Sequence, residues 1–164
     1  MAGLGQIDEG LAHLEAAART FTAHAWRAML AGTLLRQGLI QQTTGRPERA
    51  VATLESVVAL SRETRETYEE AYALAVLGEA RFALGDLAAG SRALDAAAAA
   101  LPQVGLPWHR GGILLHLAAG RLQQGEVEAA LAAADEALEL AGAEDLHEVR
   151  VQGLRIQVQA LRGK

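Results

Sequence analysis

The chain has 164 residues and no cysteine, so neither a disulfide framework nor a cysteine-based metal site can form. Its formal net charge of −5 comes without a basic stripe, which argues against binding to a nucleic-acid backbone. Hydrophobic residues make up 51% of the chain and aromatic residues only 4%, so the core must consist mainly of Ala, Leu and Val. The sequence has neither an apolar run long enough for a transmembrane helix nor a signal-peptide pattern, so we expect a cytoplasmic protein without a membrane partner.

Ala and Leu favour helices, and no long stretch alternates with the period of a strand, so we predict an all-α fold. Pro47 suits a first helical turn, Asp86 can cap the N-terminus of a helix, and Pro102 ends one. Gly142 suits a left-handed residue that follows a helix. Eight antiparallel helices are predicted at residues 6–19, 22–43, 47–62, 65–84, 86–101, 107–124, 126–141 and 144–162.

These predicted helices form a 40-residue repeat. The repeated positions are a glycine between two helices, a small residue and two apolar residues in the second helix, and a leucine in the first helix. They are Gly5, Gly45, Gly85, Gly125; Gly10, Ala50, Gly90, Ala130; Leu14, Leu54, Leu94, Ala134; Ala17, Val57, Ala97, Ala137; and Leu34, Leu74, Leu114, Leu154. Two helices per unit at this period predict a solenoid in which neighbouring pairs cover each other's apolar faces. We therefore interpret residues 1–164 as a single domain.

In one unit, large apolar residues, small residues, a turn glycine and a helix-ending proline follow one another in the order typical of a known repeat. They are Leu74, Leu77, Gly78, Gly85, Leu94, Ala97 and Pro102. This pattern resembles the tetratricopeptide (TPR) repeat over essentially the whole chain, although Arg81 and Arg121 stand near the place of an expected aromatic residue. The unit is longer than the usual length of about 34 residues and resembles the MalT-like repeats of bacterial signal-responsive ATPase regulators. It is also similar to repeats attached to some bacterial adenylate cyclases. The resemblance implies a right-handed α–α superhelix.

The sequence offers little for catalysis or metal binding. His109 and His116 are seven residues apart, whereas a helical zinc pair prefers a spacing of four. The GRLQQGE segment at 120–126 has the glycine spacing of a phosphate-binding loop but carries Glu where the loop needs Lys. Glu63, Glu66 and Glu70 form one acidic ridge on a helix, which is expected to be solvated rather than catalytic. We expect no enzyme activity, no metal and no cofactor.

A second acidic feature follows the repeat. Glu15, Glu55, Asp95 and Asp135 occupy one position of each second helix. This column is either a solvated convex face or a line of charge for a basic partner.

The TPR resemblance implies that the first helix of each pair lines an inner, concave groove. The candidate binding residues in that groove are Arg36, Gln42, Tyr72, Glu79, Phe82, His116, Gln123, Arg155 and Gln159. Apolar walls with sparse polar groups suit a peptide or a small ligand, although the same residues would also suit an ordinary groove surface. The function we expect is a non-enzymatic interaction or scaffold module that binds a partner segment in the groove. The alternative is a small-molecule-sensing module of a larger bacterial transcriptional or signalling regulator.

The chain opens with the second helix of a unit and closes with the first helix of another. In the last helix, one apolar set is expected to pack on the preceding pair: Val151, Leu154, Val158 and Leu161. Val149 and Ile156 would then form an exposed strip, and Leu11, Leu14 and Phe21 would be undercovered at the other end. Such strips predict either a homodimer joined through the terminal helices or an excised part of a longer array.

Overall fold

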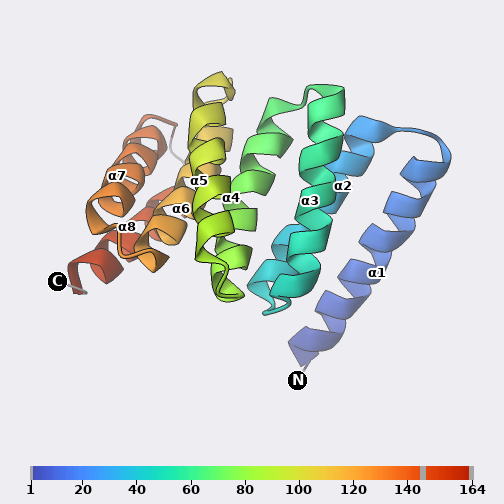
Figure 1. Cartoon of the computed structure of the whole chain (residues 1–164), viewed down its shortest axis with the longest axis horizontal. Helices are drawn as coiled ribbons and strands as arrows, with labels where there is room; N and C mark the ends of the chain where they lie inside the picture. Colours follow the sequence, from blue (N-terminus) through green and yellow to red (C-terminus); the bar gives the residue numbers. More distant parts are fainter. Residues whose placement is uncertain (1, 145–146, 163–164) are drawn as a thin grey trace.

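The structure is a computed structural model that describes residues 2–144 and 147–162. Within these ranges the chain forms eight α-helices and one short 3-10 turn and no strand, which confirms the all-α prediction (Figure 1). The helices are α1 (Ala2–Ala23), α2 (Arg27–Thr43), α3 (Pro47–Thr64), α4 (Thr67–Ala83), α5 (Leu87–Ala100), α6 (Pro107–Gln123), α7 (Val127–Glu144) and α8 (His147–Arg162), with the 3-10 turn η1 at Leu101–Gln103. In the described part of the chain, every helix is too short or too polar to cross a membrane.

The helices follow one another side by side in chain order (Figure 1). Each helix packs on the next one, and the even-numbered helices also contact each other in the order α2, α4, α6, α8. Among the described residues, no two odd-numbered helices make a comparable contact. The even-numbered helices therefore form the more tightly packed of two layers.

The hairpin turns confirm three of the four predicted turn glycines. Gly45, Gly85 and Gly125 have φ angles of 72°, 80° and 79°, in the left-handed region that glycine adopts without strain. The prediction for Gly5 is wrong, because this glycine lies inside α1. α1 also contains Gly3 and Gly10, and each glycine in a helix costs about 1 kcal/mol, so the helix-favouring Ala, Leu and Glu residues of this long helix outweigh them.

Two helix ends lie at other residues than predicted. Ala25 has a φ of 55°, and the Trp26 N–H donates to the Phe21 carbonyl at 2.9 Å, so α1 ends there and α2 begins at Arg27 rather than at residue 22. Gly142 lies inside α7 instead of ending it. The predicted cap is confirmed at Asp86, whose carboxylate accepts the Ala89 N–H at 3.1 Å.

Fully buried leucines pack against glycines in the core. Leu94 is completely buried and Leu74 is 6% exposed, as predicted. A Cβ atom added at Gly78 or at Gly120 would lie only 2.6 Å from a Leu94 methyl carbon. The missing side chains therefore let α4 and α6 approach α5 closely enough for Leu94 to lie between all three helices. Leu54 occupies the same place against Gly38 in the preceding unit.

The packing of the last helix corrects the predicted assignment of its two apolar sets. Ile156 is 8% exposed and Val149 packs on the core, whereas Leu154 is 50% exposed. The reason is Gly153, where an added Cβ would lie 2.9 Å from Leu138, so this side of α8 faces α7. The chain itself therefore covers the C-terminal strip that motivated the homodimer. The side chains of the rest of the first set, Val151, Val158 and Leu161, lie outside the described residues.

The N-terminal strip is only partly open. Leu11 is 6% exposed, and Leu14 and Phe21 are half-buried.

Candidate functional site

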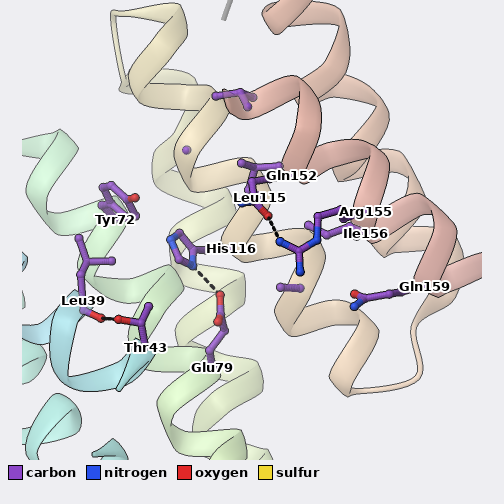
Figure 2. Close-up of a pocket in the computed structure, with 13 residues that line it drawn as sticks. Leu39, Thr43, Tyr72, Glu79, Leu115, His116, Gln152, Arg155, Ile156 and Gln159 are labelled. Atoms are coloured by element: carbon purple, nitrogen blue, oxygen red, sulfur yellow. Dashed lines mark hydrogen bonds and ion pairs between the residues drawn. The ribbon is translucent and has the colours of Figure 1, made fainter. Parts of the chain in front are cut away.

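A cleft of about 650 Å³ opens on the even-numbered layer (Figure 2). All four even-numbered helices contribute to its walls. The lining residues are Leu39 and Thr43 of α2; Tyr72 and Glu79 of α4; Gly112, Leu115, His116 and Ala119 of α6; and Val149, Gln152, Arg155, Ile156 and Gln159 of α8. The site thus brings together segments of three predicted units and of the last helix.

Five of the nine predicted groove residues line this cleft. They are Tyr72, Glu79, His116, Arg155 and Gln159. Their α4 and α6 members lie on facing sides of two adjacent helices because residues seven apart, such as Tyr72 and Glu79, share a helix face. The expectation that Glu79, His116 and Arg155 share one surface is confirmed.

The other four predicted residues lie elsewhere. Phe82 is 8% exposed, and its ring fills the space beside Gly90, between α4 and α5. Phe82 is ten positions after Tyr72, which at about 100° per residue is about 80° short of three full helical turns. Its side chain therefore points away from the Tyr72 face of α4 and into the core. Gln123 is exposed at the end of α6, and Arg36 is exposed on α2, where its guanidinium donates to the Gly32 carbonyl at 3.3 Å.

Gln42 is half-buried at the end of α2, outside the cleft lining. Its side-chain oxygen is buried and accepts no hydrogen bond from the described residues.

The most enclosed polar group of the cleft is a histidine–carboxylate pair. The His116 Nδ1 hydrogen-bonds to Glu79 Oε1 at 2.7 Å, and their side chains are only 23% and 13% exposed. Because a carboxylate oxygen accepts the bond, Nδ1–H is the donor, and the second ring nitrogen, Nε2, is left for a bound group. The Tyr72 ring lies against this imidazole, with centroids 5.2 Å apart.

The opposite wall, formed by α8, combines apolar residues with polar groups and a cation. Arg155 extends from α8 across the cleft towards the His116–Glu79 pair (Figure 2). Its guanidinium donates to the Gln152 side-chain oxygen at 3.4 Å and is otherwise exposed. Gln152, Arg155 and Gln159 share one face of α8, because they are spaced by three and four residues. Together these groups can bind an anion and hydrogen-bond a peptide backbone. Among the described residues, no three His, Cys, Asp or Glu side chains are grouped so that they could hold a metal ion.

Aromatic rings continue from the cleft along α4 and α6. Tyr68 lies 5.6 Å from Tyr72, and His109 stacks on Tyr68 with centroids 3.7 Å apart and an interplanar angle of 16°. Trp108 then lies 3.7 Å from His109. Burial raises the pKa of the Tyr68 hydroxyl to about 12, with smaller contributions from Tyr72 and Glu69, and burial lowers the pKa of His109. Sequence reasoning missed Tyr68 and Trp108, although they occupy one position of the 40-residue repeat.

The acidic column has a partner that sequence reasoning also missed. Glu55 forms an ion pair with Arg81, and Asp95 forms one with Arg121 at 2.5 Å. In both pairs the arginine follows the acid by 26 residues and belongs to the next unit. The repeated spacing between these arginines and the acids was the available signal. Asp135 in turn accepts a hydrogen bond from the Gln157 side-chain amide of α8, so three of the four acids of the column link neighbouring units.

No protein-family model matches this chain, and no curated protein matches it.

Proposed function

We propose that this chain is a non-enzymatic interaction module that holds a partner segment in the cleft between α2, α4, α6 and α8. The observation that carries the proposal is that all four even-numbered helices supply side chains to one open surface. This surface combines apolar walls, such as Leu115 and Ile156, with a cation and amides. Such a surface suits an extended segment, whose side chains need apolar contacts and whose backbone needs hydrogen-bond partners.

A right-handed superhelix of TPR-like, MalT-like repeats is part of this proposal. Three observations support it: the 40-residue spacing of left-handed glycines, the repeated contact of a buried leucine with a glycine, and the continuous even-numbered layer. In such a superhelix the even-numbered layer would be the concave side, which is where the cleft opens.

The polar groups define what the partner segment should offer. Arg155 favours a carboxylate or another anion, and the half-buried His116 Nε2 can exchange a hydrogen bond with a backbone group. The Gln152 and Gln159 amides can pair with peptide N–H and C=O groups along α8.

A small-molecule sensor is the second candidate function, and the size of the cleft favours it. Its volume of about 650 Å³ lies within the range of about 300–1,000 Å³ that is usual for ligand pockets. A ligand of this kind would need an acidic group for Arg155 and a ring or hydrocarbon body for the apolar walls.

Selection from a displayed library of random, unstructured peptides tests the proposal. We expect enriched peptides to bind the wild-type chain and to lose most of their affinity for Arg155→Glu and for Tyr72→Ala. Arg92→Glu on α5 is the matched control, because it makes the same charge change at an exposed arginine outside the cleft. Equal binding to Arg155→Glu and to Arg92→Glu would contradict a site in the cleft.

A thermal-shift screen of small organic acids examines the second candidate. Stabilisation of the wild-type chain that disappears in Arg155→Glu would favour the sensor function over the peptide-binding function.

A further inference from the structure

Three of the six Phe, Trp and Tyr residues of this chain lie on one surface together with two histidines. Tyr68, Tyr72, His109, Trp108 and His116 form a continuous row of ring contacts along α4 and α6, which we call the aromatic row. It runs from the cleft, which Tyr72 and His116 line, to Trp108, which is 53% exposed. The row therefore extends the proposed binding cleft beyond its own walls.

The geometry of the row points to an elongated occupant. An aromatic cage for a single cation needs ring faces that converge on one point. Here His109 is stacked almost parallel on Tyr68, so these two rings cover each other's inner faces. Successive contacts instead follow the helix axes. Over the span from Trp108 to His116, a rise of 1.5 Å per residue gives a length of about 12 Å.

Hydrogen-bond donors lie among the ring faces. The indole N–H of Trp108 and the hydroxyl of Tyr68 are hydrogen-bond donors at neutral pH. Gly112, beside Tyr72, adds no side chain to the surface, and a Cβ atom there would meet the Tyr72 hydroxyl at 3.6 Å. Apolar rings interleaved with donors suit a backbone whose carbonyls have no internal partners. A polyproline II (PPII) helix is such a backbone.

The charge beside the row selects among elongated ligands. Glu66 and Glu69 flank Tyr68 at the start of α4, and Arg36 is the nearby cation. Burial, together with the neighbouring Glu66, raises the pKa of Glu69, so its carboxylate favours a positive neighbour. Glu63 and Glu70 already pair with Arg27 and Arg62. Glu69, whose charge acts on the Tyr68 hydroxyl, therefore favours a basic side chain at this end of the row.

We infer that the aromatic row binds a proline-rich segment in the PPII conformation, with an arginine or lysine that lies beside Glu66 and Glu69. About four residues of such a segment, at 3.1 Å each, match the length of the row. This inference rests on the proposed function, because it names the kind of partner segment that enters the cleft. The prolines lie on the rings, and the segment continues past Tyr72 towards Arg155.

The test is fluorescence anisotropy with labelled synthetic peptides and the full chain. The probe is a short polyproline peptide that ends in arginine. It is compared with the same peptide ending in glutamate, with a Gly/Ser peptide of equal length, and with oligouridine. Trp108→Ala and Tyr68→Ala remove rings of the row. Trp26→Ala is the matched control, because Trp26 is 51% exposed but lies outside the row. Tyr68→Phe keeps the ring, and circular dichroism checks that each variant is folded.

We expect the arginine peptide to bind the wild-type chain and Trp26→Ala equally. Binding to Trp108→Ala or Tyr68→Ala should be about tenfold weaker, since aromatic anchors carry much of the affinity of an interface. Tyr68→Phe keeps the ring but loses the hydroxyl donor, so it should bind more tightly than Tyr68→Ala and more weakly than the wild-type chain. The glutamate peptide should bind about tenfold more weakly than the arginine peptide. Equal binding of the Gly/Ser peptide, preferential binding of oligouridine, or an equal loss in Trp26→Ala would overturn the inference.

Failure of the inference can be told apart from failure of the proposed function. If library peptides bind in an Arg155-dependent way while the polyproline peptide does not bind, only the inference falls. If neither kind of peptide binds, both fall.

Discussion

Leu94→Ala should destabilise the chain more than any single exposed substitution. Leu94 is completely buried and contacts two glycine positions, Gly78 and Gly120, which have no side chains that could move into the space it leaves. Leucine-to-alanine changes in cores cost about 2–5 kcal/mol, and sites that cannot collapse lie at the upper end. We therefore expect a loss of about 4 kcal/mol in the free energy of unfolding. Leu87→Ala, at a leucine that is 61% exposed, should change it by less than about 0.5 kcal/mol.

A double-mutant cycle makes the packing argument sharper. Gly120→Ala alone introduces a methyl group 2.6 Å from a Leu94 carbon, and such overpacking costs about 1–3 kcal/mol, partly offset by about 1 kcal/mol of helix propensity. In the Leu94→Ala background the clash is gone and the new methyl group fills part of the cavity. The double variant should thus be more stable than the sum of the single effects by about 2 kcal/mol.

Urea unfolding followed by far-UV circular dichroism measures all four members of the cycle. Additive effects, or a Leu94→Ala variant as stable as the wild-type chain, would refute the placement of Leu94 between α4, α5 and α6.

Three further predictions concern charge and capping. Arg121→Gln should lower the free energy of unfolding in urea by about 1 kcal/mol, because it breaks ion pairs with two acids that are themselves about half exposed. The loss should be smaller at high salt. Arg92→Gln, at an exposed arginine, should leave the free energy of unfolding unchanged. Ultraviolet titration should show one tyrosine, assigned by Tyr68→Phe, that ionises near pH 12. Because burial raises its pKa above the ordinary value of 10, its contribution to stability is full below pH 10 and is lost as the pH rises towards 12. Asp86→Ala should cost about 1 kcal/mol in thermal unfolding, since the Ala89 N–H loses its acceptor; an unchanged stability would contradict the cap.

Most of the fold was predictable from the 40-residue repeat. A 40-residue period places glycines, small residues and leucines in fixed columns, so the hairpin turns at Gly45, Gly85 and Gly125 follow from the sequence alone. The prediction was wrong at the first of the four repeated glycine positions, where the surrounding sequence differs. Gly5 has the spacing of a turn glycine but lies within α1, because the helix-favouring residues of α1 outweigh its three glycines, Gly3, Gly5 and Gly10.

Rotation of a helix about its axis was harder to predict. Both apolar sets of α8 have helical spacing, and the contact between Gly153 and Leu138 decides which set packs. Phe82 lies about 80° round α4 from Tyr72, and its fit beside Gly90 decides that its ring enters the core. These choices depend on contacts between residues of different helices, which a single sequence does not display.

The candidate site was predictable to the extent that it follows the inner helices. Tyr72, Glu79, His116 and Arg155 come together because they lie on matching faces of α4, α6 and α8. The ion pairs of Arg81 with Glu55 and of Arg121 with Asp95 join two different positions of the repeat, so the recurrence of either position alone does not predict them. The sequence does carry a signal for them, because the acid and the arginine have the same sequence separation in both pairs.

The most direct test of the central claim is an NMR titration of the isotope-labelled chain with peptides selected from the displayed library. Binding in the cleft predicts shift changes concentrated on the even-numbered helices, at residues 39–43, 72–79, 112–119 and 152–159. The same titration of Arg155→Glu should lose most of these changes, whereas Arg92→Glu should keep them. Changes concentrated on α3, α5 and α7, or a pattern that Arg155→Glu leaves intact, would contradict the claim that this cleft holds the partner segment.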